Sequence, residues 1–173
     1  VLAGNSDAMV LASLQTLIGT MKQHLAAPSD LVDIRAIDGL VGVSVAGDTL
    51  SIGAVTTHAE VVANADFQRL CPALAKLANG IGGPVVHHMG TIGGSIANND
   101  PAADYPAGLL ALGATIVTKR MKLQLMRSLR ACLQPRWSQV RSSLRLKSWR
   151  LPKRRMPNFH NWPRVMPWLV FCR

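Results

Sequence analysis

The chain has 173 residues and carries 19 Lys and Arg against 9 Asp and Glu, a formal net charge of +10. This length suits one domain or two small ones, and such a charge taken alone suggests a nucleic-acid or anionic-membrane partner. No apolar run reaches the roughly 20 residues of a membrane span. The three cysteines are too widely spaced for a disulfide framework or a zinc motif, which excludes a metal site of that kind and favours the reducing cytoplasm.

The charge is divided sharply between two segments. Residues 1–118, the head, hold all 9 acids and 4 bases, so their net charge is 4 − 9 = −5. Residues 119–173, the tail, hold 15 bases and no acid, all 4 tryptophans and none of the 14 glycines. At about 12% acids in ordinary proteins, an acid-free stretch of this length has a chance on the order of one in a thousand. The composition therefore describes two unlike segments.

Apolar periodicity and turn residues predict the secondary structure of the head. In chain order the predicted elements are a strand over 9–11, a helix over 14–25, a strand over 31–34, a hairpin of 41–45 and 49–52, helices over 58–64, 72–79 and 107–112, and a strand over 114–117. Thr57 and Glu60 have the spacing of a capping box, and Pro72 and Gly80 mark a helix start and stop. This irregular alternation predicts α+β or α/β layers.

The most informative segment is glycine-rich and runs from Gly90 to Pro106. Paired glycines let a backbone turn tightly and approach a ligand closely, and a phosphate is held by convergent N–H donors. Thr91 and Ser95 add hydroxyl groups, and Asp104 could accept a hydrogen bond from a sugar or an amide. From these residues alone, an ordinary glycine turn followed by a helix cap remains an equal alternative.

The run MGTIGGSIANNDPAADYPAGLLALGATIVT, residues 89–118, resembles the second flavin motif of the FAD-binding medium subunits of molybdenum hydroxylases, of the carbon monoxide dehydrogenase and xanthine dehydrogenase type. Residues 25–34 and 52–60 resemble, in order, the strand after the first flavin loop of that family and its hairpin-to-helix segment. The resemblance covers residues 5–118. It implies an α+β fold, the two-subdomain FAD-binding domain of the molybdopterin dehydrogenase flavoprotein type (PCMH-like).

The resemblance places the flavin between two subdomains, residues 1–53 and 54–118. The sequence starts at Val1 and shows neither an initiator Met nor a signal-peptide pattern there. We therefore expect the first subdomain to be incomplete at its N-terminus. The implied cofactor is FAD. Its implied contacts are a first loop against the pyrophosphate, one residue near the ring and a second loop: Ala12, Ser13, Leu14, Gln15, Thr16 and Leu17; Ile81; and Thr91, Gly93, Gly94, Ser95 and Asp104.

The first loop departs from the family pattern, which reads A-G-G-x-S/T-L. Ser13 and Leu14 replace both glycines. If those positions need positive φ, a β-carbon costs roughly 1 kcal/mol or more at each. Leu14 would also push a branched side chain toward the phosphates. Both replacements therefore act against flavin affinity.

The resemblance implies the electron-transfer subunit of an oxidoreductase. Electrons would pass from [2Fe–2S] clusters in a small subunit to FAD here and on to NAD or another acceptor, and substrate would react at a molybdopterin-binding large subunit. The flavin carries the chemistry, so no catalytic side chain and no metal ligand is predicted. His58 is predicted to lie on the surface at a helix start, and His87 and His88 to be a structural pair in an extended segment.

The tail admits several interpretations. Arg with interleaved aromatics can bind nucleic acid, but the flavin resemblance argues against a nucleic-acid partner. A basic disordered tail and an inactive, pseudogene-like fragment are further alternatives. The favoured interpretation is a frameshift near residue 119. We considered the codons that could encode residues 121–127, 133–143 and 164–170 and read them in the frame that starts at the third base of the first codon. Each segment then permits a peptide that resembles family sequence, in the same order as in the family, and the last of them is Arg-Tyr-Ala-Met-Val-Gly. This predicts a tail, residues 119–173, with no native fold.

Overall fold

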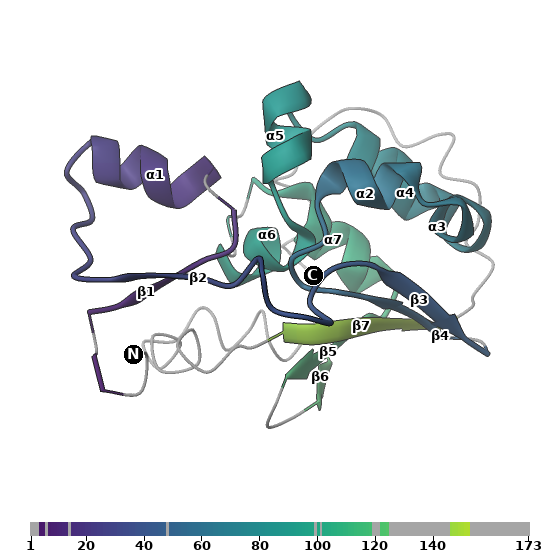
Figure 1. Cartoon of the computed structure of the whole chain (residues 1–173). Helices are drawn as coiled ribbons and strands as arrows, with labels where there is room; N and C mark the ends of the chain where they lie inside the picture. Colours follow the sequence, from purple (N-terminus) through teal and green to yellow (C-terminus); the bar gives the residue numbers. More distant parts are fainter. Residues whose placement is uncertain are drawn as a thin grey trace, which may run out of the picture.

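The computed structural model describes residues 4–5, 7–13, 15–47, 49–98, 100, 102–118, 122–124 and 146–152. They form two β-sheets with helices packed around them (Figure 1). In chain order the elements are β1 (Met9–Leu11), α1 (Gln15–Lys22), β2 (Leu31–Asp33), β3 (Val43–Ala46), β4 (Thr49–Ile52), α2 (His58–Ala63), α3 (Ala65–Leu70), α4 (Pro72–Asn79), α5 (Pro84–Met89), α6 (Ile92–Asn98), α7 (Asp104–Ala111), β5 (Thr115–Thr118), β6 (Lys122–Gln124) and β7 (Leu146–Pro152).

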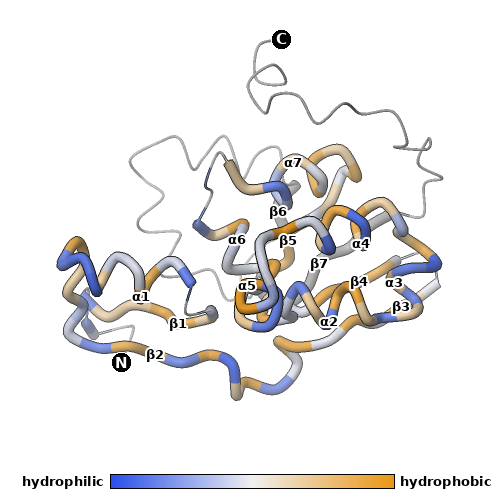
Figure 2. Tube along the Cα trace, turned by 90° about the horizontal axis from the view of Figure 1, so that it is seen from above, coloured by the Kyte–Doolittle hydropathy of each residue, from blue (hydrophilic) through white to orange (hydrophobic). Residues whose placement is uncertain are grey.

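The smaller sheet is a β–α–β unit. Strands β1 and β2 are parallel, with Met9 opposite Leu31 and Leu11 opposite Asp33, and α1 makes the crossover between them. In two perpendicular views this unit lies to one side of the other helices (Figures 1 and 2). Residues 12 and 13 follow β1 on the way to α1.

The larger sheet has the strand order β3-β4-β7-β5-β6, and every neighbouring pair in it is antiparallel. The predicted hairpin is present as β3 and β4, with Val43 opposite Ile52. It shares a sheet with β5, so the two sheets divide between Asp33 and Val43. The subdomain division at residue 53 stays a prediction.

Two segments of the tail form strands that the sequence did not lead us to expect. Lys122–Gln124 and Leu146–Pro152 are strands β6 and β7, and β7 lies between β4 and β5. The N–H and C=O groups along the edge of a strand need hydrogen-bond partners, and the main chain of an added strand supplies them whatever its side chains are. The other tail residues lie outside the part of the chain that the structure describes.

The capping box is confirmed. The hydroxyl of Thr57 accepts a hydrogen bond from the Glu60 amide at 3.2 Å, and the Glu60 carboxylate accepts one from the Thr57 amide at 2.7 Å. Three helices were not predicted: α3, α5 and α6. Helix α6 contains Gly93 and Gly94, which disfavour helix in isolation. Tertiary contacts described below compensate for this.

The core lies between the larger sheet and the helices packed on it. Its largest fully buried apolar side chains come from β4, α2 to α4, α6, α7 and β5: Tyr105, Phe67, Ile52, Leu74, Ile92, Leu109, Ile116 and Val61. None of the helices described here combines the length and the apolar character that crossing a membrane requires.

Two aromatic side chains that carry polar atoms, His58 and Tyr105, are buried in this core. His58 is 4% exposed and Tyr105 is fully buried, and their ring centroids are 5.2 Å apart. Burial, together with the nearby His87, lowers the pKa of the His58 imidazole from 6.5 to about 4. Burial also raises the pKa of the Tyr105 hydroxyl. Among the described residues, neither His58 Nδ1 nor the Tyr105 hydroxyl finds a hydrogen-bond partner, at a cost of about 1–3 kcal/mol for each such group.

We expect this histidine to make the fold sensitive to acid. Between pH 6.5 and about 4 the unfolded chain binds a proton at His58 that the folded chain does not, so stability falls as the pH drops through this window. The contribution is about 1.4 kcal/mol per pH unit. Urea denaturation of the wild type and of His58→Phe at several pH values measures it. Between pH 6.5 and about 4, the free energy of unfolding should fall more steeply with decreasing pH in the wild type than in His58→Phe. Equal pH dependence in the two proteins would contradict the lowered pKa of His58.

Candidate functional site

The glycine-rich loop is held by a neighbouring backbone segment. Residues 54–58 run beside residues 90–93: the amide of Ile92 donates to the Thr56 carbonyl at 3.1 Å, and that of Gly93 to the Ala54 carbonyl at 2.9 Å. Thr57 and Thr91 form an isolated antiparallel bridge. The loop is therefore fixed by main-chain hydrogen bonds, which do not depend on its side chains.

The two adjacent glycines serve different purposes. A β-carbon on Gly93 would lie 2.4 Å from the Ala54 carbonyl oxygen, so only glycine permits this close backbone packing. A β-carbon on Gly94 would lie 2.7 Å from Thr91 Oγ1 and 3.5 Å from Ser13 Oγ. Gly93 thus seats the loop against the core, whereas Gly94 faces the other predicted loop.

The amides of the second loop are already engaged. Besides Ile92 and Gly93, the Gly94 amide donates to the Thr91 hydroxyl at 3.1 Å, and the Ser95 amide donates to the Thr91 carbonyl at 3.0 Å. Thr91 itself is 2% exposed. The convergent N–H donors that the sequence predicted are therefore not free to bind a ligand in this loop. What it offers a ligand is main chain without a β-carbon at Gly94 and the half-buried Ser95.

The first loop has the donors that the second lacks. Ala12 and Ser13 connect β1 to α1, and Gln15 is the first residue of α1. The first amides of a helix have no acceptor inside it. Within the described residues, the amides of Gln15, Thr16 and Leu17 have no acceptor elsewhere either. Leu14 lies outside the described residues.

The remaining two predicted contacts lie on other elements. Asp104 is the exposed first residue of α7, directly before the buried Tyr105. Ile81 lies between α4 and α5, half-buried and packed against the core. The structure thus brings Ser13 and Gly94 together. The assignment of all twelve residues to flavin stays a prediction.

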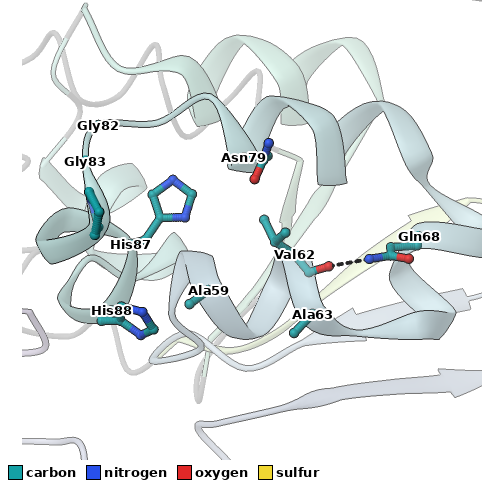
Figure 3. Close-up of a pocket in the computed structure, with 10 residues that line it drawn as sticks. Ala59, Val62, Ala63, Gln68, Asn79, Gly82, Gly83, His87 and His88 are labelled. Atoms are coloured by element: carbon teal, nitrogen blue, oxygen red, sulfur yellow. Dashed lines mark hydrogen bonds between the residues drawn. The ribbon is translucent and has the colours of Figure 1, made fainter.

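A surface groove of about 570 Å³ lies between α2, α5 and the end of α4 (Figure 3). It is lined by Ala59, Val62, Ala63, Gln68, Asn79, Gly82, Gly83, Pro84, His87 and His88. None of the predicted flavin contacts lines it, although Ile81 directly precedes Gly82.

Two expectations about histidines are wrong. His58 is buried instead of lying on the surface, because the inner face of α2 carries both His58 and Val61. Residues three apart lie on the same face of a helix, so the spacing of His58 and the apolar Val61 could have indicated that His58 is buried. His87 and His88 lie on helix α5 and not in an extended segment.

The chain matches a known protein family and several known proteins. Residues 1–141 match the family model described as the FAD binding domain in molybdopterin dehydrogenase. The chain is 41% identical over 108 residues to the carbon monoxide dehydrogenase medium chain of Afipia carboxidovorans, covering 62% of this chain and 38% of that protein. It is 35% identical over 119 residues to the 6-hydroxypseudooxynicotine dehydrogenase complex subunit alpha of Paenarthrobacter nicotinovorans, covering 69% of this chain and 40% of that protein.

The fold is similar to a solved structure as well. The carbon monoxide dehydrogenase from Hydrogenophaga pseudoflava superposes with a TM-score of 0.78 at 30% identity, over 88% of this chain and 54% of that one. The chain spans about two fifths of the length of the curated relatives it matches. Because the family model covers most of the chain, this protein belongs to the family of FAD-binding domains of molybdopterin dehydrogenases.

Proposed function

We propose that the chain is the FAD-binding electron-transfer subunit of a molybdenum-containing hydroxylase or dehydrogenase. The observation that carries this is the meeting of Ser13 with Gly94, which brings the two predicted flavin loops side by side. FAD is the cofactor of the family to which the chain belongs, and the relatives are dehydrogenase subunits.

The residues present fit FAD at both loops, and the two loops suit different parts of the cofactor. The amides at the start of α1 suit the pyrophosphate, since a helix N-terminus attracts anions and these donors have no acceptor among the described residues. Gly94 presents main chain beside Ser13, with no β-carbon of its own. The Ser95 hydroxyl and the Asp104 carboxylate can then hydrogen-bond to polar groups of the nucleotide.

Bound FAD would supply the chemistry, accepting and passing on electrons. The side chains of this domain bind and orient, and none is assigned a proton transfer. Thr91 shapes the second loop through the Gly94 amide and does not need to touch the ligand. Ile81 would pack near the ring from the α4–α5 loop.

The assembly and its electron route are part of the proposal. Two relatives are named as a medium chain and as one subunit of a complex. By analogy this chain would join a molybdopterin-binding large subunit and a [2Fe–2S] small subunit in the cytoplasm. Electrons would leave through FAD to NAD or another acceptor.

Flavin binding at Gly94 is tested by thermal unfolding with and without FAD. A ligand at about a hundredfold its Kd stabilises a fold by about 2.7 kcal/mol, so FAD should raise the Tm of the wild type. Gly94→Ala places a methyl group against Thr91 Oγ1 and toward Ser13, and should reduce this shift. Gly19→Ala is the control, because nothing lies within 4 Å of that position. No shift in the wild type, or equal shifts in both variants, would contradict the proposal.

The first loop allows a test by gain of affinity. Ser13 is not among the described residues with positive φ, so the backbone cost expected for it does not apply. If Leu14 costs roughly 1 kcal/mol, the variant Leu14→Gly should bind FAD about fivefold more tightly. Fluorescence titration of FAD measures both dissociation constants. Unchanged or weaker binding would show that this loop does not contact the cofactor in the proposed way.

The frameshift in the tail is a separate proposal about the reading frame. It is supported by the absence of acids after residue 118 and by curated matches of 108 and 119 residues, close to the length of the head. Strands β6 and β7, together with the family match that extends to residue 141, contradict the prediction that the tail has no structure. The proposal therefore concerns only the reading frame of the DNA. Sequencing the DNA across codons 115–125 tests it: the shifted frame should be open and encode acids, and early stop codons would refute it.

A further inference from the structure

The β1–α1–β2 unit, which carries the first predicted flavin loop, is joined to the core mainly through one linker. Among the described residues, the core cluster and the side chains packed on it come only from residues 43–116. Helix α1 has no buried side chain, and in the two strands only Leu11 is buried. The hydrogen bonds described for this unit also stay inside it, such as that from the Ile34 amide to the Leu11 carbonyl at 3.1 Å. The position of the unit relative to the core therefore depends on the segment that follows β2.

This linker has two different parts. The first part, residues 35–39, is exposed. Leu40 is 6% exposed, and its carbonyl accepts a hydrogen bond from the Val55 amide at 2.8 Å. The Gly42 carbonyl accepts one from the Gly53 amide, also at 2.8 Å. The second part of the linker is thus fixed to the core.

The side chain of Thr56 completes this joint. Thr56 is fully buried, and its hydroxyl accepts a hydrogen bond from the Gly42 amide at 2.9 Å and donates one to the Gly42 carbonyl at 3.1 Å. Gly42 has a φ of +104°, a backbone conformation that residues with a β-carbon rarely adopt. The Thr56 hydroxyl therefore holds both main-chain groups of the residue at which the linker enters the core.

The main chain of Thr56 holds the other predicted loop. Its carbonyl accepts a hydrogen bond from the Ile92 amide at 3.1 Å, two residues before Gly94. One buried residue thus binds the end of the linker through its side chain and the glycine-rich loop through its main chain. Thr56 is not among the predicted flavin contacts.

We infer that Thr56 is a positioning residue, which sets the place of the first flavin loop relative to the second by fixing Gly42 and the glycine-rich loop to one point. In the proposed site FAD has to reach the start of α1 and the main chain at Gly94 together. Its binding is stronger when the two loops already stand at the right distance, because no affinity is then lost in ordering them. The inference rests on the proposed function, since this distance matters only if one ligand contacts both loops.

Two substitutions in the full chain separate the hydroxyl of Thr56 from the bulk of its side chain. Thr56→Val keeps the volume and loses the hydroxyl, whereas Thr56→Ser loses a methyl group and keeps the hydroxyl. For each variant, urea denaturation without FAD gives the unfolding midpoint, and fluorescence titration gives the Kd for FAD. Ile116→Val is the control, because it trims a buried core side chain on β5.

We expect Thr56→Val to bind FAD about tenfold more weakly than the wild type, which is the size of one lost hydrogen bond. Thr56→Ser should lower the unfolding midpoint and yet keep the Kd within about twofold of the wild type, because the hydroxyl still holds Gly42. Ile116→Val should lower the midpoint and leave the Kd unchanged.

A double variant adds a readout that a merely structural role would not move. Once Gly94→Ala has weakened the contact at the second loop, the distance between the loops matters less. Adding Thr56→Val to Gly94→Ala should therefore weaken FAD binding by less than about twofold further.

Gly42→Ala tests the joint from its other side. Nothing lies within 4 Å of the added β-carbon, so the strain at a φ of +104° is the only change. We expect FAD binding to weaken as it does in Thr56→Val. If Thr56→Val does not fold, Gly42→Ala takes its place in the comparison.

Wild-type affinity in Thr56→Val, or an affinity that follows the unfolding midpoint in every variant including Ile116→Val, overturns the inference alone. A full additional loss of affinity in the double variant overturns it as well. No FAD binding by the wild type would overturn the proposed function, and this inference with it.

Discussion

The site depends on the main-chain contact between residues 54–58 and 90–93. Hydrogen bonds from Ile92 and Gly93 to the Thr56 and Ala54 carbonyls hold the loop, and Gly93 is indispensable because a β-carbon there would meet the Ala54 oxygen at 2.4 Å. This contact also explains why a sequence with two adjacent glycines forms the start of helix α6. The helix begins where the neighbouring segment receives its first amides, and the Thr91 hydroxyl receives the next.

In the proposed site, that arrangement divides the binding of FAD between two loops. Because the amides of residues 92–95 are used inside the protein, the second loop contributes shape and a hydroxyl group. The donors for an anion lie at the start of α1, on the small β1–α1–β2 unit. The two departures from the family pattern, Ser13 and Leu14, therefore fall on the loop to which we assign the pyrophosphate, although Ser13 does not have the positive φ that would make a β-carbon costly.

Much of the head follows from local signals in the sequence. The Thr57–Glu60 box and Pro72 set the starts of α2 and α4, since these caps act within one turn. Helix α6 could not be predicted in this way, because its stability comes from Ala54 and Thr56, more than 30 residues away in the chain. The burial of His58 likewise depends on Tyr105 and Gly90. The meeting of Ser13 with Gly94 required the three-dimensional fold, whereas the resemblance could supply only the two motifs.

We propose above all that one flavin binds where these two loops meet. Equilibrium titration of the purified 173-residue chain with FAD, followed by flavin fluorescence, tests it most directly. We expect saturable binding of one FAD per chain, which Gly94→Ala weakens and Gly19→Ala leaves intact. Absence of saturable binding, or binding that is indifferent to Gly94→Ala, would contradict it.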